Sequence, residues 1–280
     1  MPTEVLVVVL LSALLHAGWN AIVRASGDKL MASLLVAFGA AALALPLLPW
    51  LPLPATASLP FLLSSALIHV VYFLLVARAY RDADLGLAYP LMRGTAPLLT
   101  TLAAAVWLGE VPGARTALGI ALICAGVLAL AVVAWRAAAR PSGAVLAAVA
   151  NAGVIALYTV IDGQGVRLAG HALAYSAWLF VLTALLLLGA ALLWRGPAGL
   201  RLPAGARRVM LLGGAGTLGA YSLVLWAMAR APVAGVAALR ETSIVFAALI
   251  GALLLHEPLG RSRLLAVVLV GAGAAALRLG

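Results

Sequence analysis

Long hydrophobic runs separated by short polar turns occupy most of the chain. Ten such runs lie at about residues 4–24, 30–50, 59–80, 85–107, 113–135, 143–161, 170–194, 207–229, 232–255 and 260–279. A helix of this length crosses the ~30 Å hydrocarbon core of a bilayer. Backbone groups in lipid must be satisfied within their own segment, and no run shows the period-two alternation of a barrel strand. The pattern predicts an all-α integral membrane protein with ten transmembrane helices.

The composition excludes a soluble protein. Hydrophobic residues make up 66% of the 280 residues and charged residues only 9%, whereas about 25% of a soluble domain is charged. A soluble chain of this length has too little interior to bury so much apolar surface. Cys124 is the only cysteine, so an intrachain disulfide is excluded as well.

The basic residues indicate the orientation of the spans. The net charge is +10, but the arginines stand singly or in pairs and form no arm or stripe for nucleic acid. Anionic membrane lipid is the partner that we expect for them. Apart from Arg93 and Arg240 within spans, the basic residues on one side are Arg115, Arg167, Arg230 and Arg278, and those on the other are Arg24, Lys29, Arg78, Arg81, Arg136, Arg140, Arg195, Arg201, Arg207, Arg208, Arg261 and Arg263.

The positive-inside rule places the larger of these two groups in the cytoplasm, so both termini are predicted to be periplasmic. Many Ala, Leu, Gly and Arg residues beside a single lysine are typical of a GC-rich bacterial genome. The predicted location is therefore the bacterial inner membrane.

The two halves of the sequence resemble each other. The stretch Tyr89–Gly113 parallels Ala238–Gly260, and a single offset places Arg93 on Arg240, Glu110 on Glu257 and Gly113 on Gly260. Five spans are an odd number, so the second copy must enter the membrane from the opposite side. We expect a first repeat at 1–138 and a second, inverted repeat at 141–280. Inverted repeats of this kind are typical of secondary transporters, whose binding site lies between the repeats.

The chain also resembles a known family. The Gly-Trp-Asn sequence at 18–20, the Glu-x-x-Gly turns at Glu110 and Glu257, and the five-plus-five spans are similar to the drug/metabolite transporter superfamily, and more closely to its EamA-type exporters. In size and aromatic content the chain resembles an aromatic amino-acid exporter of that superfamily. The resemblance implies a basket in which spans 1–4 and 6–9 surround a central cavity, while spans 5 and 10 brace the edges.

Three charged residues lie well inside the spans. Arg93 and Arg240 each lie roughly 12 Å below the start of their helix, and Glu241 is the only acidic residue that the predicted boundaries place deep in a span. Such charges are costly in lipid and should face a wet cavity or a partner. Both arginines are candidates for binding a substrate carboxylate, and Glu241 for proton coupling. The alternative is that Arg240 pairs with Glu241 or with an opposing carbonyl and only ties helices together.

Aromatic and polar side chains recur in the middle of several spans and could line the cavity. His16, Trp19 and Asn20 share a face of the first span, and His69 and Tyr72 share a face of the third. The further candidates are Tyr89, Tyr158, Trp178, Tyr221 and Ser222. The alternatives are a neutral histidine bonded to a nearby carbonyl and aromatic rings that simply fill the bundle.

Prolines and acidic turn residues mark the ends and bends of several helices. Pro90 and Pro97 in the fourth span and Pro232 at the ninth are candidate gating hinges, or static bends that shape the basket. Glu110 and Glu257 precede the fifth and tenth spans, where a carboxylate can cap free backbone N–H groups.

These features predict a secondary transporter that exports small metabolites by alternating access. Amino acids are the expected substrates, with aromatic ones as one candidate class. An intramembrane enzyme or lipid-handling protein and a passive pore are the alternatives. No Walker loop, zinc-type Cys/His spacing or G-x-S-x-G motif occurs, so we expect no enzyme activity, cofactor or metal. A monomer is compatible with the sequence.

Overall fold

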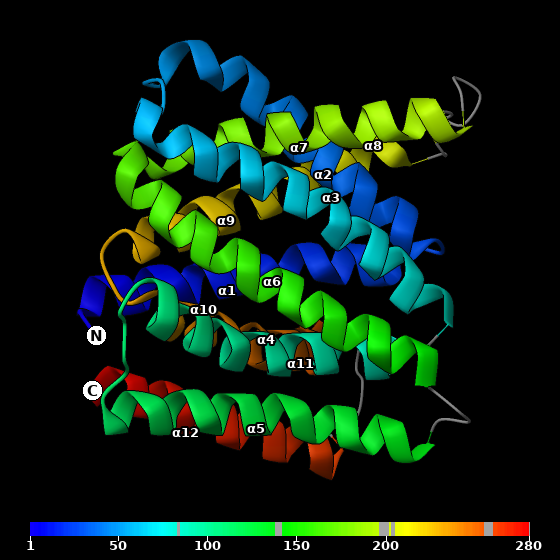
Figure 1. Ribbon diagram of the computed structural model, residues 1–280. Helices are drawn as coiled ribbons and strands as arrows, with labels where there is room; N and C mark the ends of the chain where they lie inside the picture. Colours follow the sequence, from blue (N-terminus) through cyan, green and yellow to red (C-terminus); the bar gives the residue numbers. More distant parts are fainter. Residues whose placement is uncertain (83–84, 138–141, 196–201, 203–204, 255–259, 280) are drawn as a thin grey trace.

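The computed structural model is a bundle of long helices that lie roughly side by side (Figure 1). It describes residues 1–82, 85–137, 142–195, 202, 205–254 and 260–279. The first half contains α1 (Thr3–Ala25), α2 (Lys29–Ala44) with the 3-10 turn η1 (Leu45–Trp50), the 3-10 turn η2 (Thr56–Ser58), α3 (Leu59–Asp82), α4 (Leu85–Trp107) and α5 (Ala114–Ala137). The second half contains α6 (Ser142–Ala169), α7 (Ala172–Arg195), α8 (Ala206–Arg208), the π-helical turn η4 (Val209–Gly213), α9 (Gly214–Met228), α10 (Val233–Arg240), α11 (Ser243–Leu254) and α12 (Arg261–Leu279).

The predicted all-α membrane fold is confirmed within the described residues, and α4 differs from the other long helices. Nine segments have the length and mean hydropathy of a membrane span, and α4 is not among them although it has 23 residues. It carries Arg93 and two internal prolines, which lower its hydropathy. Helices α5, α6 and α10 pack on α4, and the half of α4 that carries Arg93 is largely buried. The C-terminal end of α4 lies at the outer surface of the bundle.

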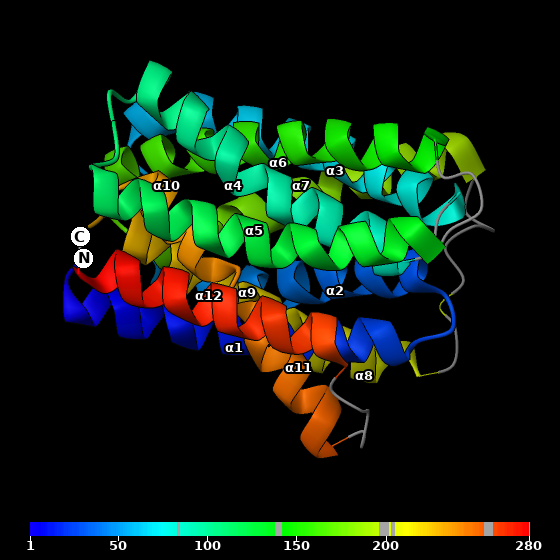
Figure 2. The same ribbon diagram turned by 90° about the horizontal axis from the view of Figure 1, so that it is seen from below.

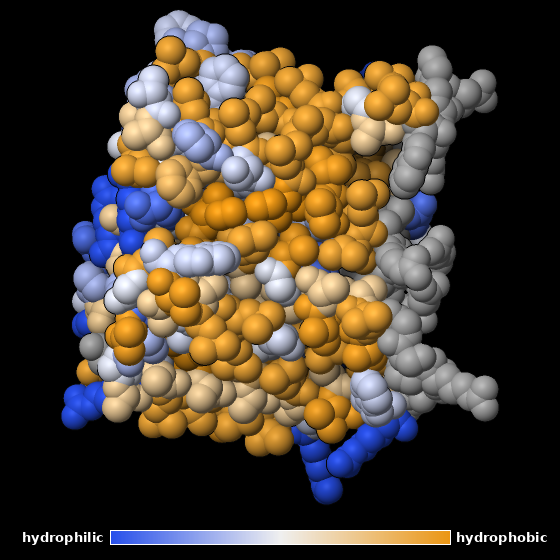
Figure 3. All heavy atoms as spheres, viewed as in Figure 1, coloured by the Kyte–Doolittle hydropathy of each residue, from blue (hydrophilic) through white to orange (hydrophobic). Residues whose placement is uncertain are grey.

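The outer surface is apolar, as lipid requires. Leu193, Val106 and Val111 are 89%, 79% and 78% exposed. Figure 3 shows hydrophobic residues across most of one face, with hydrophilic residues at the margins, many of them at the end of the bundle where the termini lie. Such an exposed apolar surface is stable only when lipid covers it.

The two halves run in opposite senses and pack against each other. Both termini lie at one end of the bundle, called the termini end below, and α6 begins at the opposite end (Figures 1 and 2). Most of the closest helix pairs join one half to the other: α5 packs on α12, α3 on α6, α1 on α9, and α2 on α7. The pair α5 and α12 forms one edge of the bundle, at the bottom of Figure 1.

The predicted hinges differ from the observed irregularities. Pro90 and Pro97 lie within α4, which continues through both. Pro232 only precedes α10 as its N-cap residue. The ninth span is instead broken in its middle, because α10 ends at Arg240 and α11 begins at Ser243. Two residues, Glu241 and Thr242, form the turn between them.

Glu110 caps a helix of the other half. We expected it to cap the helix that follows it, α5, but its Oε2 accepts a hydrogen bond of 2.7 Å from the backbone N–H of Val233, the first residue of α10. Its Oε1 forms an ion pair of 2.6 Å with Arg167, near the end of α6. Arg167 in turn donates to the carbonyls of Met228 and Ala231. We call these contacts the Glu110 clamp, and they join the halves at the termini end. Glu257, the predicted counterpart of Glu110, lies outside the described residues.

A pair of glycines lets α5 and α12 approach closely, and this contact is testable. A Cβ on Gly273 would lie 2.7 Å from the Gly119 carbonyl oxygen, whereas a Cβ on Gly271 would meet nothing within 4 Å. We expect Gly273→Ala to lower the free energy of unfolding by about 1–3 kcal/mol, because the helices must separate. Gly271→Ala, on the same helix, should leave it unchanged or raise it. Thermal unfolding in detergent measures both, and equal stability of the two variants would contradict this packing.

Candidate functional site

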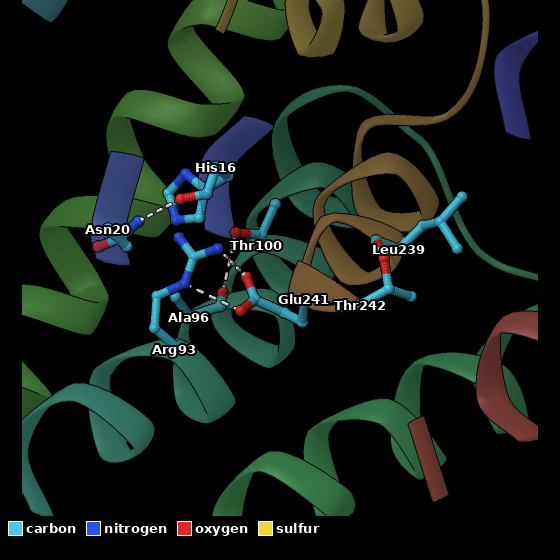
Figure 4. A network of polar contacts seen from close by, with 8 residues as sticks. All are labelled: His16, Asn20, Arg93, Ala96, Thr100, Leu239, Glu241 and Thr242. Atoms are coloured by element: carbon cyan, nitrogen blue, oxygen red, sulfur yellow. Dashed lines mark hydrogen bonds and ion pairs between the residues drawn. The ribbon is translucent and has the colours of Figure 1, made fainter. Parts of the chain in front are cut away.

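An ion pair between the two halves lies at the centre of the bundle. Arg93 of α4 donates from Nε to Oε2 of Glu241 at 2.9 Å, and its Nη2 lies 2.8 Å from Oε1 (Figure 4). The two residues are only 6% and 3% exposed. Neither charge alone would be tolerated at this depth, since an unpaired charge in a membrane interior costs several kcal/mol. The pair therefore holds α4 against the broken ninth span.

The break between α10 and α11 places Glu241. The N–H groups of Glu241 and Thr242 donate to the carbonyls of Ala238 and Leu239, three residues back, so the helix tightens and stops. The Thr242 hydroxyl also donates to the Leu239 carbonyl, at 2.8 Å. These local bonds satisfy the backbone of the turn, which is the condition for irregular structure inside a membrane.

A small pocket adjoins the ion pair. Its lining includes Arg93, Arg240 and Glu241 beside the apolar and hydroxyl residues Ala96, Pro97, Thr100, Ile155, Thr159 and Ala237. Its volume suits about one water molecule. The Thr100 hydroxyl donates to the Ala96 carbonyl of its own helix. The centre of the bundle is thus polar but closed in this conformation.

Helix α1 presents polar groups to the same centre. His16 is 7% exposed and interacts electrostatically with Arg93 and Arg240, and its ring contacts Trp19 edge to face at 4.9 Å. Among the described side chains, His16 Nε2 and Trp19 Nε1 are buried without a hydrogen-bond partner. Asn20 donates to the His16 carbonyl at 2.8 Å (Figure 4). Buried atoms without partners at a charged site are places where a ligand could bond.

Five rings from four helices form an aromatic group beside the centre. His69 of α3 stacks on Tyr158 of α6 with ring centroids 4.3 Å apart, and Tyr72 contacts both rings by its edge or face. Tyr221 of α9 contacts His69 and Phe180. The Arg240 guanidinium carbon lies 5.8 Å from the Tyr221 ring centroid, which connects the aromatic group to the pocket. The aromatic group is defined by His69, Tyr72, Tyr158, Phe180 and Tyr221.

The sequence analysis missed a second buried carboxylate, Asp162. The prediction that Glu241 is the only acid deep in a span is wrong, because α6 continues to Ala169 and encloses Asp162 with no exposed surface. Its Oδ1 accepts from the Tyr175 hydroxyl at 3.0 Å, and its Oδ2 accepts from the Tyr221 hydroxyl. The apolar run was ended at 161, eight residues before the end of α6 at Ala169. The signal available was Arg167, which lies three residues before Gly170 and marks a later helix end.

The other predicted site residues lie in several places. Tyr89, one turn before Arg93, interacts with it electrostatically. Trp178 packs against the main hydrophobic core, and within the described residues it takes no part in the ring contacts of the aromatic group. Ser222 bonds to Ser176 across α7 and α9 at 2.6 Å and to the Leu218 carbonyl. The alternative pairing of Glu241 with Arg240 is wrong, since the ion-pair partner of Glu241 is Arg93.

Comparison with known proteins identifies the class. A family model described as the EamA-like transporter family matches residues 3–132 and again 142–279. A solved structure titled only "Crystal structure of protein" has the same fold, with a TM-score of 0.77 over 100% of this chain and 98% of that one at 20% sequence identity. No curated protein matches the sequence.

The chain is therefore a multi-pass membrane transporter, and not an enzyme. It belongs to the EamA-like transporter family, and its two halves are two EamA domains.

The ion pair predicts a specific pattern of stability. Glu241→Gln leaves the buried Arg93 without a counter-charge, so we expect the free energy of unfolding to fall by about 3–5 kcal/mol. The double variant Arg93→Leu with Glu241→Leu should recover much of this loss, because neither charge then remains in the interior. Arg230→Gln is the matched control, since Arg230 is exposed and stacks on Trp226. A single and a double variant of equal stability would contradict the pairing.

Proposed function

We propose that this transporter exports amino acids across the bacterial inner membrane, and that the substrate binds by taking the place of the Arg93–Glu241 ion pair. The observation that carries the proposal is the two-point contact between these side chains, at 2.9 and 2.8 Å, in a closed polar pocket. Its charges match those of an amino acid, whose carboxylate suits a guanidinium and whose ammonium suits a carboxylate.

Exchange of partners keeps the charges balanced. When a zwitterion separates Arg93 from Glu241, each buried charge receives a new partner, so neither is left unpaired. A simple cation would neutralise Glu241 but leave Arg93 without a counter-charge, which costs several kcal/mol. A simple anion would leave Glu241 with only the electrostatic interaction with Arg240, which forms no direct ion pair with it. The pair thus selects zwitterions by rejecting ligands of one charge.

The surroundings of the pair suit the rest of an amino acid. His16 Nε2 and Trp19 Nε1 are buried donors or acceptors without partners, available to the polar end of a substrate. The aromatic group offers ring faces and edges to an apolar side chain. Arg240 lines the pocket and lies against Tyr221, between these two regions. This arrangement favours bulky side chains and keeps aromatic amino acids as a candidate class.

The contacts between the two halves support a mechanism of alternating access. The ion pair joins them at the centre and the Glu110 clamp joins them at the termini end. Pro97 has no N–H to donate to the Arg93 carbonyl, and Glu241 lies in a helix break, so both segments that carry the pair can bend. We propose that opening of the termini end, predicted to be periplasmic, requires the clamp to separate after the pair has exchanged partners.

Counterflow in proteoliposomes tests substrate recognition. We expect saturable exchange of amino acids, and no exchange of their N-acetyl or methyl ester derivatives, because each derivative lacks one of the two charges. Arg93→Gln and Glu241→Gln should both lose exchange, whereas Arg230→Gln should retain it. Exchange of the derivatives at rates similar to the parent amino acids would exclude zwitterion recognition, and flux that rises linearly with concentration would indicate a pore.

Cysteine labelling tests the clamp. In a Cys124→Ser background, Ala96→Cys places a single thiol in the pocket lining. We expect a membrane-impermeant thiol reagent added from the termini side to label it several-fold faster when Glu110→Gln is also present, because the substituted amide cannot form the ion pair with Arg167. Glu4→Gln, near the start of α1, is the control for removal of a carboxylate. Unchanged labelling in the Glu110 variant would show that the clamp does not close this end.

A further inference from the structure

Asp162 is a buried carboxylate that takes no part in the Arg93–Glu241 ion pair. It has no exposed surface, and its partners Tyr175 and Tyr221 come from α7 and α9. Within the described part of the chain, no arginine or lysine forms an ion pair with it. Glu241 differs in this respect, because Arg93 holds it in direct contact. The two intramembrane carboxylates therefore have different surroundings. Glu241 is paired with a cation, whereas Asp162 is bonded by neutral hydroxyls.

We infer that Asp162 is a proton-binding site, and that it gains and loses one proton during each transport cycle. The inference rests on the proposed function for the link to substrate. Protonation breaks no bond between heavy atoms: a proton adds to one Asp162 oxygen, and the carboxylate becomes a neutral acid. The tyrosine bonded to that oxygen then turns its hydroxyl and accepts from the acid instead of donating to it.

The groups around Asp162 favour a proton over a metal cation. Both neighbouring tyrosine hydroxyls donate their single hydrogen to the carboxylate, so their hydrogens face it. A sodium ion at the same place would need oxygen lone pairs directed at it, from carbonyls or further carboxylates. Within the described residues, no group of three His, Cys, Asp or Glu side chains is placed to hold a metal ion.

Several other ionisable groups lie on α6 and on the helices packed against it. His69 of α3 interacts electrostatically with Asp162, and its Nδ1 donates to the Ser65 carbonyl at 2.9 Å, which fixes the proton on that nitrogen. The remaining groups on the packed helices are Tyr72 of α3, Tyr89 and Arg93 of α4, Tyr158 and Arg167 of α6 itself, Tyr175 of α7, Tyr221 of α9, Arg240 of α10 and Glu241 of the turn after α10. Of these, the arginines nearest the centre are Arg93, which is paired with Glu241, and Arg240.

Tyr221 connects the proton site to the pocket. Its hydroxyl bonds to Asp162, and its ring contacts both His69 and the Arg240 guanidinium. When Asp162 takes up a proton, the Tyr221 hydroxyl loses its charged acceptor. Movement of Tyr221 would then shift Arg240, which lies against its ring and lines the pocket. Proton binding and substrate binding would therefore affect each other. Substrate moving outward would be exchanged for a proton moving inward.

Proton movement in proteoliposomes tests the inference. With a pH dye trapped inside, an amino-acid gradient should drive proton flux through the wild type. Asp162→Asn should retain amino-acid counterflow but lose the proton flux. Asp28→Asn is the matched control, because Asp28 is an exposed helix cap that asparagine replaces well, and it should keep both activities.

Each outcome decides one of the two proposals. Counterflow without proton flux in the wild type, or proton flux that persists in Asp162→Asn, overturns the role of Asp162 and leaves the proposed function intact. Absence of counterflow in the wild type overturns the proposed function.

Infrared spectroscopy then tests Asp162 without transport. Carbon-13 aspartate labelling of the wild-type protein should shift a protonated-carboxyl band that appears on acidification and is absent from Asp162→Asn. Should Asp162→Asn fail to fold, Tyr221→Phe tests the same band, which should change position because the acid loses one hydrogen-bond partner. A band unaffected by aspartate labelling would overturn the inference.

Discussion

A buried ion pair between two oppositely oriented halves sets the constraints on the rest of the molecule. Arg93 and Glu241 lie at a depth where each is tolerated only in contact with a partner. The helices that bear them are accordingly unusual: α4 is a long helix without the mean hydropathy of a membrane span, and the span with Glu241 is broken into α10 and α11. The surrounding helices compensate by presenting apolar surfaces to lipid and by packing on the half of α4 that carries Arg93.

The same pair explains why the centre is closed. Its two charges neutralise each other, and the adjoining pocket has room for about one water molecule. A site that satisfies its own charges is stable when empty, and we propose that it opens to a ligand that satisfies both charges at once. Substrate binding would then remove one of the contacts between the halves, since the ion pair joins α4 to the second half. The Glu110 clamp adds a second contact at the termini end, so loss of the central pair alone does not separate the halves there.

Local patterns predicted the fold well, whereas pairings across the chain could not be predicted. The ten spans were predicted from hydropathy and the repeat from the alignment of Arg93 with Arg240, because neither requires knowledge of which side chains touch in the folded protein. The partner of Arg93 lies 148 residues away. In the sequence, the adjacent Arg240 was an equally reasonable partner for Glu241. Glu110 likewise caps α10 in place of its own helix. Asp162 was missed because the span was ended at 161, and Trp178 and Ser222 face packing contacts that a mid-span position does not reveal.

A structure determined with a bound amino acid would show whether the ligand replaces the Arg93–Glu241 ion pair. We expect the ligand carboxylate at the Arg93 guanidinium, its ammonium at the Glu241 carboxylate, and the two side chains no longer in contact. An amino acid bound elsewhere in the bundle, with the Arg93–Glu241 contact intact, would contradict this expectation.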